Sequence, residues 1–179
     1  MNYIYSCLKS EYINNGLFKL QTVQKIHIEK IREWRNSQID LLRQKEYVSK
    51  IDQMKYFNNN VWSELDSKTP NNILLAFTLN DKLIGYGGLV HISWKYLKAE
   101  SSFILNNNID HHSEKYKLYI NNFFIMLKIL AFNDFKFLKI TSETFNHRKK
   151  HIKLLEEIGF KIILKPVYSN SIFHELHPD

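Results

Sequence analysis

Short apolar runs separated by polar turn residues extend along most of the chain. Runs of this kind, rich in β-branched and aromatic residues, predict strands. They lie at residues 3–8, 17–23, 73–79, 82–92, 99–105, 138–143, 160–164 and 171–176. Asn14-Asn15-Gly16 and Asn80-Asp81 separate neighbouring runs, so we expect hairpins at both places.

Apolar residues spaced three and four apart predict helices between these strands. The first helix covers residues 26–38, the second begins at the N-cap residue Ser49, and the last covers 148–158 and ends at Gly159. A long helix with a wide apolar face follows a polar loop at 106–112. The apolar positions expected to be buried are Ile28, Ile31, Trp34, Met54, Phe57, Val61, Trp62, Tyr116, Tyr119, Ile120, Phe123, Met126, Leu127, Leu130, Ile152, Leu155 and Ile158.

The order of elements predicts an α+β (mixed α/β) fold. We expect a central, mostly antiparallel, twisted sheet of about six to seven strands with helices on both faces. The long helix would cross over between the strands at 99–105 and 138–143 and make them a parallel pair. The 179 residues form a single domain, 1–179, in this interpretation.

Composition narrows the function classes. The formal net charge of +7 favours anionic partners such as phosphate-bearing cofactors or nucleotide-linked substrates. The basic residues are scattered, so we expect no nucleic-acid partner. The N-terminal residues lack a signal-peptide pattern and no apolar run is long enough to span a bilayer, so we expect a cytoplasmic protein with no membrane partner. Cys7 is the only cysteine, which fits a reducing compartment.

The stretch 84–105 carries the strongest candidate chemistry. Gly85, Gly87 and Gly88 remove side chains from one strand, which indicates a bulge or a close backbone approach. Glu100 and His91 are titratable groups in apolar strands, where proton chemistry or a polar hairpin face both remain open. His147 and His151 lie four residues apart, but the intervening cations oppose a metal, so no metal site is expected.

Four stretches in order resemble the GCN5-related N-acetyltransferase (GNAT) superfamily. EWRN at 33–36 ends the first helix, IGYGGL at 84–89 and AESSFIL at 99–105 match two adjacent strands, and LLEEIGF at 154–160 matches the last helix. The subgroup resembled contains ribosomal-protein N-terminal acetyltransferases and amino-sugar N-acetyltransferases of surface-glycan pathways.

The resemblance implies acetyl-CoA (coenzyme A) as cofactor and acetyl transfer to an amine. By position, the main-chain N–H groups of Phe103, Ile104 and Leu105 would hold the pantetheine arm and polarise the thioester carbonyl. The N–H groups of residues 113–116 would face the diphosphate; the residues implied there are Ser113, Glu114, Lys115, Tyr116, Lys117 and Arg148. Glu100 is implied as the base, with His91 second and Glu143 third.

The same resemblance places an acceptor pocket around the end of the first helix. Its implied residues are Trp34, Arg35, Asn36, Gln38, Arg43 and Gln44, with Glu143 from the neighbouring sheet. For Trp34 a core position is favoured. For Arg43 and Gln44 a role in binding the acceptor is favoured.

The sequence departs from the superfamily in two places. The segment 110–116 lacks the glycines of the usual pyrophosphate loop, and Leu155 stands where many members have a tyrosine acid. A non-catalytic coenzyme A-binding module is therefore one alternative, and a protein N-terminal acetyltransferase is another. The expected acceptor is the amino group of a nucleotide-linked deoxyamino sugar, and a homodimer is left open.

Overall fold

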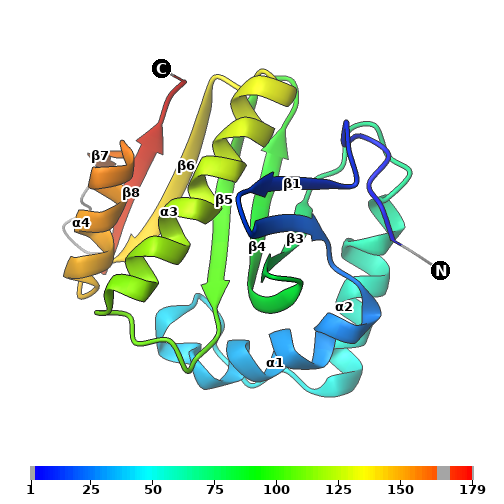
Figure 1. Cartoon of the computed structure of the whole chain (residues 1–179), viewed down its shortest axis with the longest axis horizontal. Helices are drawn as coiled ribbons and strands as arrows, with labels where there is room; N and C mark the ends of the chain where they lie inside the picture. The colour runs from blue at the N-terminus through cyan, green and yellow to red at the C-terminus, as the bar shows by residue number, and fades with distance from the viewer. Residues whose placement is uncertain (1–2, 165–169, 179) are drawn as a thin grey trace.

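The computed structural model describes residues 3–164 and 170–178, within which eight strands form one sheet (Figure 1). Their order in the sheet is β1-β2-β3-β4-β5-β6-β8-β7. The strands are β1 (Tyr12–Asn15), β2 (Phe18–Thr22), β3 (Ile73–Leu79), β4 (Lys82–Ser93), β5 (Lys98–Leu105), β6 (Lys139–Phe145), β7 (Lys161–Leu164) and β8 (Ser171–Leu176). The neighbouring strands pair antiparallel except β5 and β6, which are parallel. The predicted mixed, mostly antiparallel fold is therefore confirmed, with a larger sheet than expected.

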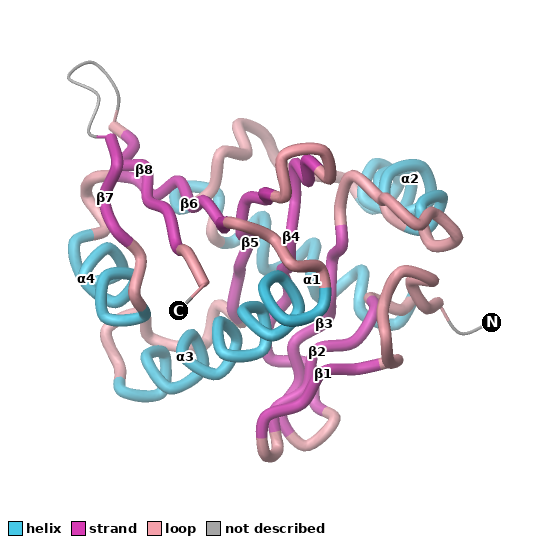
Figure 2. The backbone as a smooth tube through the Cα atoms, turned by 90° about the horizontal axis from the view of Figure 1, so that it is seen from above, coloured by secondary structure: helices cyan, strands magenta, loops and turns pink. Residues whose placement is uncertain are grey.

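Four α-helices lie in the described part of the chain: α1 (Ile28–Ser37), α2 (Lys50–Asn60), α3 (Glu114–Lys128) and α4 (Lys149–Ile158). A π-helical segment, Ile129–Asp134, extends α3. Helices α3 and α4 lie on one side of the sheet and α2 on the other, as Figure 2 shows. The crossover through α3 explains why β5 and β6 can be parallel.

The strand predicted at residues 3–8 is not present. This segment is irregular, and β1 begins only at Tyr12. Tyr5 is fully buried, and its hydroxyl accepts a hydrogen bond from the Leu74 N–H at 3.2 Å. The Ser6 N–H donates to the Leu65 carbonyl at 2.7 Å, and the Gln24 side chain binds both main-chain groups of Tyr3, so side chains and loops hold the segment in place of strand pairing.

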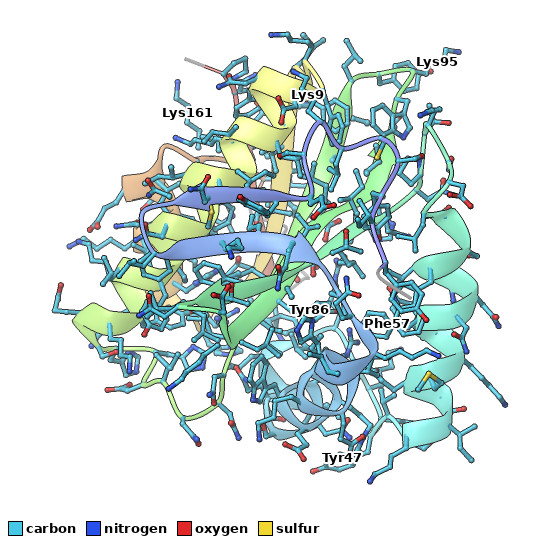
Figure 3. All side chains as sticks on the ribbon, turned by 45° about the vertical axis from the view of Figure 1, so that its right-hand side comes forward. Lys9, Tyr47, Phe57, Tyr86, Lys95 and Lys161 are labelled. Atoms are coloured by element: carbon cyan, nitrogen blue, oxygen red, sulfur yellow. The ribbon has the colours of Figure 1, made fainter. Side chains whose placement is uncertain are left out.

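Helix α2 starts at the predicted N-cap, where the Ser49 hydroxyl accepts the Asp52 N–H at 3.1 Å. Met54, expected in the core, is 39% exposed. Phe57 is buried and faces Tyr86 of β4, with ring centroids 6.4 Å apart (Figure 3). The apolar stripe of α2 is thus narrower than predicted.

Candidate active site

Strands β5 and β6 separate partway along their length. Their parallel pairing runs from Lys98 opposite Lys139 to Glu100 opposite Thr141 and then stops. Each strand continues beyond that point, β5 beside β4 and β6 beside β8. Main-chain groups on the facing edges are consequently available to a ligand between the two strands.

The direction of these main-chain groups follows from the β4–β5 register. The Asn106 N–H donates to the Ile84 carbonyl at 2.9 Å. Because bonding alternates along an antiparallel ladder, Ile104, opposite Tyr86, also turns its N–H toward β4. Phe103 and Leu105 turn theirs toward the gap. The expectation that Ile104 presents its N–H to a cofactor is therefore wrong, whereas Phe103 and Leu105 fit it.

A cleft occupies this gap, and polar side chains from both strands line it. Its lining residues are Leu41, Leu42, Arg43, Glu100, Ser101, Ser102, Phe103, Phe124, Ser142, Glu143, Thr144, Phe145, Arg148, His151 and Ser171. The structure thus brings together Glu100, Glu143, Arg43, Phe103 and Arg148, to which the sequence assigned separate roles as base, acceptor contacts and cofactor contacts. It also adds a set of hydroxyl groups that the sequence did not single out.

Two carboxylates share one guanidinium in this cleft. Arg43 forms an ion pair with Glu100, and its other terminal nitrogen lies 2.9 Å from Glu143. The side chains of Glu100 and Glu143 are 19% and 18% exposed, and that of Arg43 is 53% exposed. The carboxylates therefore form the inner wall and Arg43 approaches them from the solvent side.

His91 lies outside the cleft. It is exposed, and it sits where the β4–β5 register shifts between Val90 and Ser93. Its backbone is left-handed, with φ of 51°, and its N–H donates to the Asn72 side chain. His91, the second candidate base from the sequence, does not line the cleft that Glu100 lines, so its assignment as a base is corrected.

The predicted acceptor residues of α1 mostly hold the following loop. The Arg35 Nε donates to Gln44 at 3.0 Å and its Nη1 to Tyr86 at 3.1 Å, and Gln44 in turn donates to Asn36 at 3.0 Å. Asn36 also binds both main-chain groups of Val48. Arg35, Asn36 and Gln44 therefore position the segment that carries Arg43, and none of them lines the cleft.

Trp34 of α1 and Gln38, the residue that follows the helix, connect α1 to the interior. Gln38 is buried, and its side-chain amide donates to the Leu105 carbonyl at 2.8 Å and to the Trp34 carbonyl at 3.2 Å. The N–H and the carbonyl of one strand residue point to the same side, so this contact agrees with the Leu105 N–H facing away from β4. Trp34 is only 1% exposed, so the favoured core position holds and a role in acceptor binding does not.

The start of α3 offers fewer free N–H groups than expected. The Ser113 N–H donates to the Asp110 carbonyl, and the Ser113 hydroxyl accepts the Tyr116 N–H at 3.1 Å. The first-turn N–H groups of Glu114 and Lys115 are left to face an anion. The Lys115 ammonium points instead toward the Tyr119 ring, 5.7 Å from its centroid.

Basic side chains gather where α3 and α4 begin. One pocket there is lined by Leu41, His111, His112, Tyr116, His147, Arg148, Lys149, Lys150 and His151, and an adjoining one by His111, His112, Ser113, Glu114, Tyr116, Lys117, Lys150, Lys153, Leu154 and Glu157. The Lys117 ammonium is paired with Glu157 at 2.6 Å, so Lys149, Lys150 and Lys153 are better placed than Lys117 to meet a phosphate. The first pocket shares Leu41, Arg148 and His151 with the cleft.

A partly buried polar cluster lies where the cleft meets this basic surface. The Tyr116 hydroxyl accepts from Arg148 at 3.2 Å and lies 3.1 Å from His151 Nδ1. Burial, and then the Arg148 cation, hold the pKa of His151 well below its usual range. Burial and Arg148 also lower the pKa of His111, whose ring packs 4.7 Å from that of Tyr116. Both imidazoles are therefore neutral at pH 7.

We expect stability to fall below neutral pH and His151→Gln to weaken this dependence. Since the pKa of His151 is lowered on folding, the unfolded chain binds the proton more readily. The stabilisation is present above about pH 6.5, the ordinary histidine value, and is lost as the pH falls through and below it. Thermal unfolding between about pH 7.5 and 5.5 measures this. The exposed His112 gives the matched control, His112→Gln, and an unchanged pH slope in His151→Gln would contradict the assignment.

The described part of the chain contains neither a metal-binding group of side chains nor a membrane-spanning helix. Across residues 3–164 and 170–178, no three His, Cys, Asp or Glu side chains are grouped so as to hold a metal ion. In the same residues, every helix is too short or too polar to cross a membrane.

Comparison with known proteins gives one family. Residues 20–166 match the family model described as an acetyltransferase (GNAT) domain. A comparison with curated protein sequences finds no match.

Solved structures share the fold at low sequence identity. A spermidine N-acetyltransferase from Vibrio cholerae, in complex with CoA and spermine, is 16% identical with a TM-score of 0.73, covering 91% of this chain and 96% of that one. A dodecameric structure of that enzyme in an intermediate state is 16% identical with a TM-score of 0.68, covering 91% and 95%. An acetyltransferase from Agrobacterium tumefaciens str. C58 is 14% identical with a TM-score of 0.68, covering 96% of both chains.

Proposed function

The chain belongs to the acetyltransferase (GNAT) family and uses acetyl-CoA to acetylate an amine, and we propose that its acceptor is a small cationic amine held by Glu100 and Glu143. The observation that carries the proposal is the pair of partly buried carboxylates at the point where β5 and β6 separate.

The residues present fit acetyl-CoA. Bound acetyl-CoA supplies a thioester whose carbonyl carbon is attacked by the acceptor nitrogen. The N–H groups of Phe103 and Leu105 face the gap and can donate to the thioester oxygen or the pantetheine amides. The first-turn N–H groups of α3 and the lysines at the start of α4 offer a diphosphate site without the usual glycines.

A cationic acceptor fits the charges of the cleft. Around the carboxylates, Glu100 and Glu143 carry two negative charges against the single positive charge of Arg43, while the other guanidinium of the cleft, Arg148, is directed to the Tyr116 hydroxyl. An ammonium group gains from an anionic, partly desolvated site, whereas a diphosphate is repelled by it. The V. cholerae structure of similar fold contains spermine, an amine of this chemical class.

Proton removal is the step assigned to Glu100. An alkyl ammonium must lose a proton before its nitrogen can attack, and a carboxylate within hydrogen-bond reach, directly or through one water, can accept it. Glu143 faces the same Arg43 from the opposite strand and would hold the rest of the acceptor. Arg43 contacts only one oxygen of Glu100, Oε1, so Oε2 remains able to accept the proton.

The nucleotide-linked deoxyamino sugar is the second candidate acceptor. The half-exposed Arg43 favours it, because a guanidinium released from the carboxylates can bind a diphosphate in bidentate fashion. The N-terminal amine of a peptide is a weaker candidate, because it brings one positive charge to a cleft that contains two carboxylates.

An acceptor panel tests the proposal. Initial rates of CoA release would be measured with 1,4-diaminobutane, spermidine, a nucleotide-linked amino sugar and an alanine-led peptide. We expect the highest kcat/KM for a cationic di- or polyamine, and a KM that rises with salt because the recognition is electrostatic. The highest kcat/KM for the sugar nucleotide would replace the proposal with the second candidate.

A further inference from the structure

Arg43 belongs to a segment that is fixed on both sides. Gln38 ties the start of the segment to the end of β5, and Gln44, next to Arg43, is bound to Arg35 and Asn36. The backbone at Arg43 is thus held while its side chain extends freely to the carboxylates. A change of side-chain rotamer is enough to remove the guanidinium from the cleft.

We propose that Arg43 is a built-in substitute for the acceptor: its guanidinium occupies the cation subsite formed by Glu100 and Glu143, and the incoming amine displaces it. This inference rests on the proposed function, because it concerns the same cleft. It makes Arg43 a residue that sets acceptor affinity and selectivity rather than one that binds the acceptor.

The contacts support displacement over a fixed structural role. Arg43 reaches both carboxylates, yet its side chain is more than half exposed, whereas those of Glu100 and Glu143 are largely covered. An ion pair with such an exposed partner is weak and is exchanged easily. The guanidinium also lies at the side of the carboxylates that faces solvent, which is the side from which an amine arrives.

Displacement has a consequence for selectivity. While the cleft is empty of acceptor, Arg43 offsets the repulsion between Glu100 and Glu143, which converge on it from two strands. An acceptor must replace this neutralising charge as well as make its own contacts. An amine with a second positive charge can neutralise one carboxylate with each ammonium group. Di- and polyamines should therefore compete with Arg43 better than monoamines of equal length.

Arg43→Gln tests the proposal, with Lys45→Gln as the matched control. Lys45 is exposed on the same segment, so its replacement removes one positive charge without touching the carboxylates. We expect Arg43→Gln to lower the KM for the preferred cationic amine by roughly two- to fivefold, the range of a weak ion pair, with kcat not reduced. Lys45→Gln should leave both constants unchanged.

A second readout separates displacement from a merely structural effect. Methylguanidinium would be added as a probe to wild type and to Arg43→Gln. In Arg43→Gln the subsite is vacant, so methylguanidinium should bind there and inhibit competitively against the amine. In the wild type, where Arg43 occupies the subsite, methylguanidinium should inhibit much more weakly.

Three outcomes overturn the inference. A raised KM for the cationic amine in Arg43→Gln would show that Arg43 helps to bind it. A lowered kcat with unchanged KM would show that Arg43 positions Glu100. A raised KM for a sugar nucleotide would show that Arg43 binds its diphosphate. Failure of the proposed function is distinct, because wild type would then acetylate no cationic amine while still binding acetyl-CoA.

Discussion

Glu100→Gln is expected to lower kcat by about 10²- to 10⁴-fold, the usual contribution of a positioned base, with little change in acetyl-CoA affinity. Glutamine keeps the shape and the oxygen that faces Arg43 but does not accept the proton of an ammonium. Steady-state rates with the preferred amine, together with calorimetric binding of acetyl-CoA, measure the two effects separately.

Glu143→Gln is the matched control for this variant. Glu143 contacts the same Arg43 from β6 and is equally covered. Since we assign it to holding the acceptor, its replacement should act mainly on the acceptor KM. A Glu100→Gln enzyme with wild-type kcat, or a larger loss of kcat in Glu143→Gln, would contradict the choice of base.

Gly87→Ala is expected to destabilise the fold by about 3 kcal/mol, at the upper end of the cost of overpacking. A Cβ at Gly87 would overlap the Ser102 carbonyl oxygen and lie 2.9 Å from the Phe103 Cα. Both are backbone atoms of the paired strand β5, so neither can move without disturbing the ladder that turns Phe103 toward the cleft. Acetyl-CoA affinity should therefore fall together with stability.

Urea unfolding, with acetyl-CoA titration on the folded fraction, measures this prediction. Gly16→Asn is a suitable control, because Gly16 has φ of 59°, a conformation that asparagine tolerates, and a Cβ added there would meet no atom within 4 Å. Equal loss of stability in both variants would show that close backbone contact at Gly87 is not the cause.

The periodic parts of the chain could be predicted from the sequence, whereas contacts between distant segments could not. Ile28 and Ile31 were expected in the core from helical spacing and are buried. Residues 3–8 resemble a strand in composition, but burial of Tyr5 against β3 decides their conformation. Tertiary packing overrides local propensity in such a segment.

The site was predictable as a group of residues but not as a set of contacts. Arg43 lies 57 residues from Glu100 and 100 from Glu143, so their convergence depends on the sheet order. The difference between Ile104 and its neighbours depends on strand register, which the sequence does not give. The hydrogen bond between the Tyr116 hydroxyl and His151 Nδ1 joins the first turns of α3 and α4, and no sequence pattern near either residue predicts it.

The most direct test of the account is a crystal structure of Glu100→Gln with CoA and the acceptor of highest kcat/KM. We predict the pantetheine arm in the gap between β5 and β6, beside the Phe103 N–H. The acceptor nitrogen should lie within about 3.2 Å of the side chain at position 100, or one water away, with Arg43 turned out of the cleft. An acceptor bound away from both residues 100 and 143, or CoA outside this gap, would contradict the account.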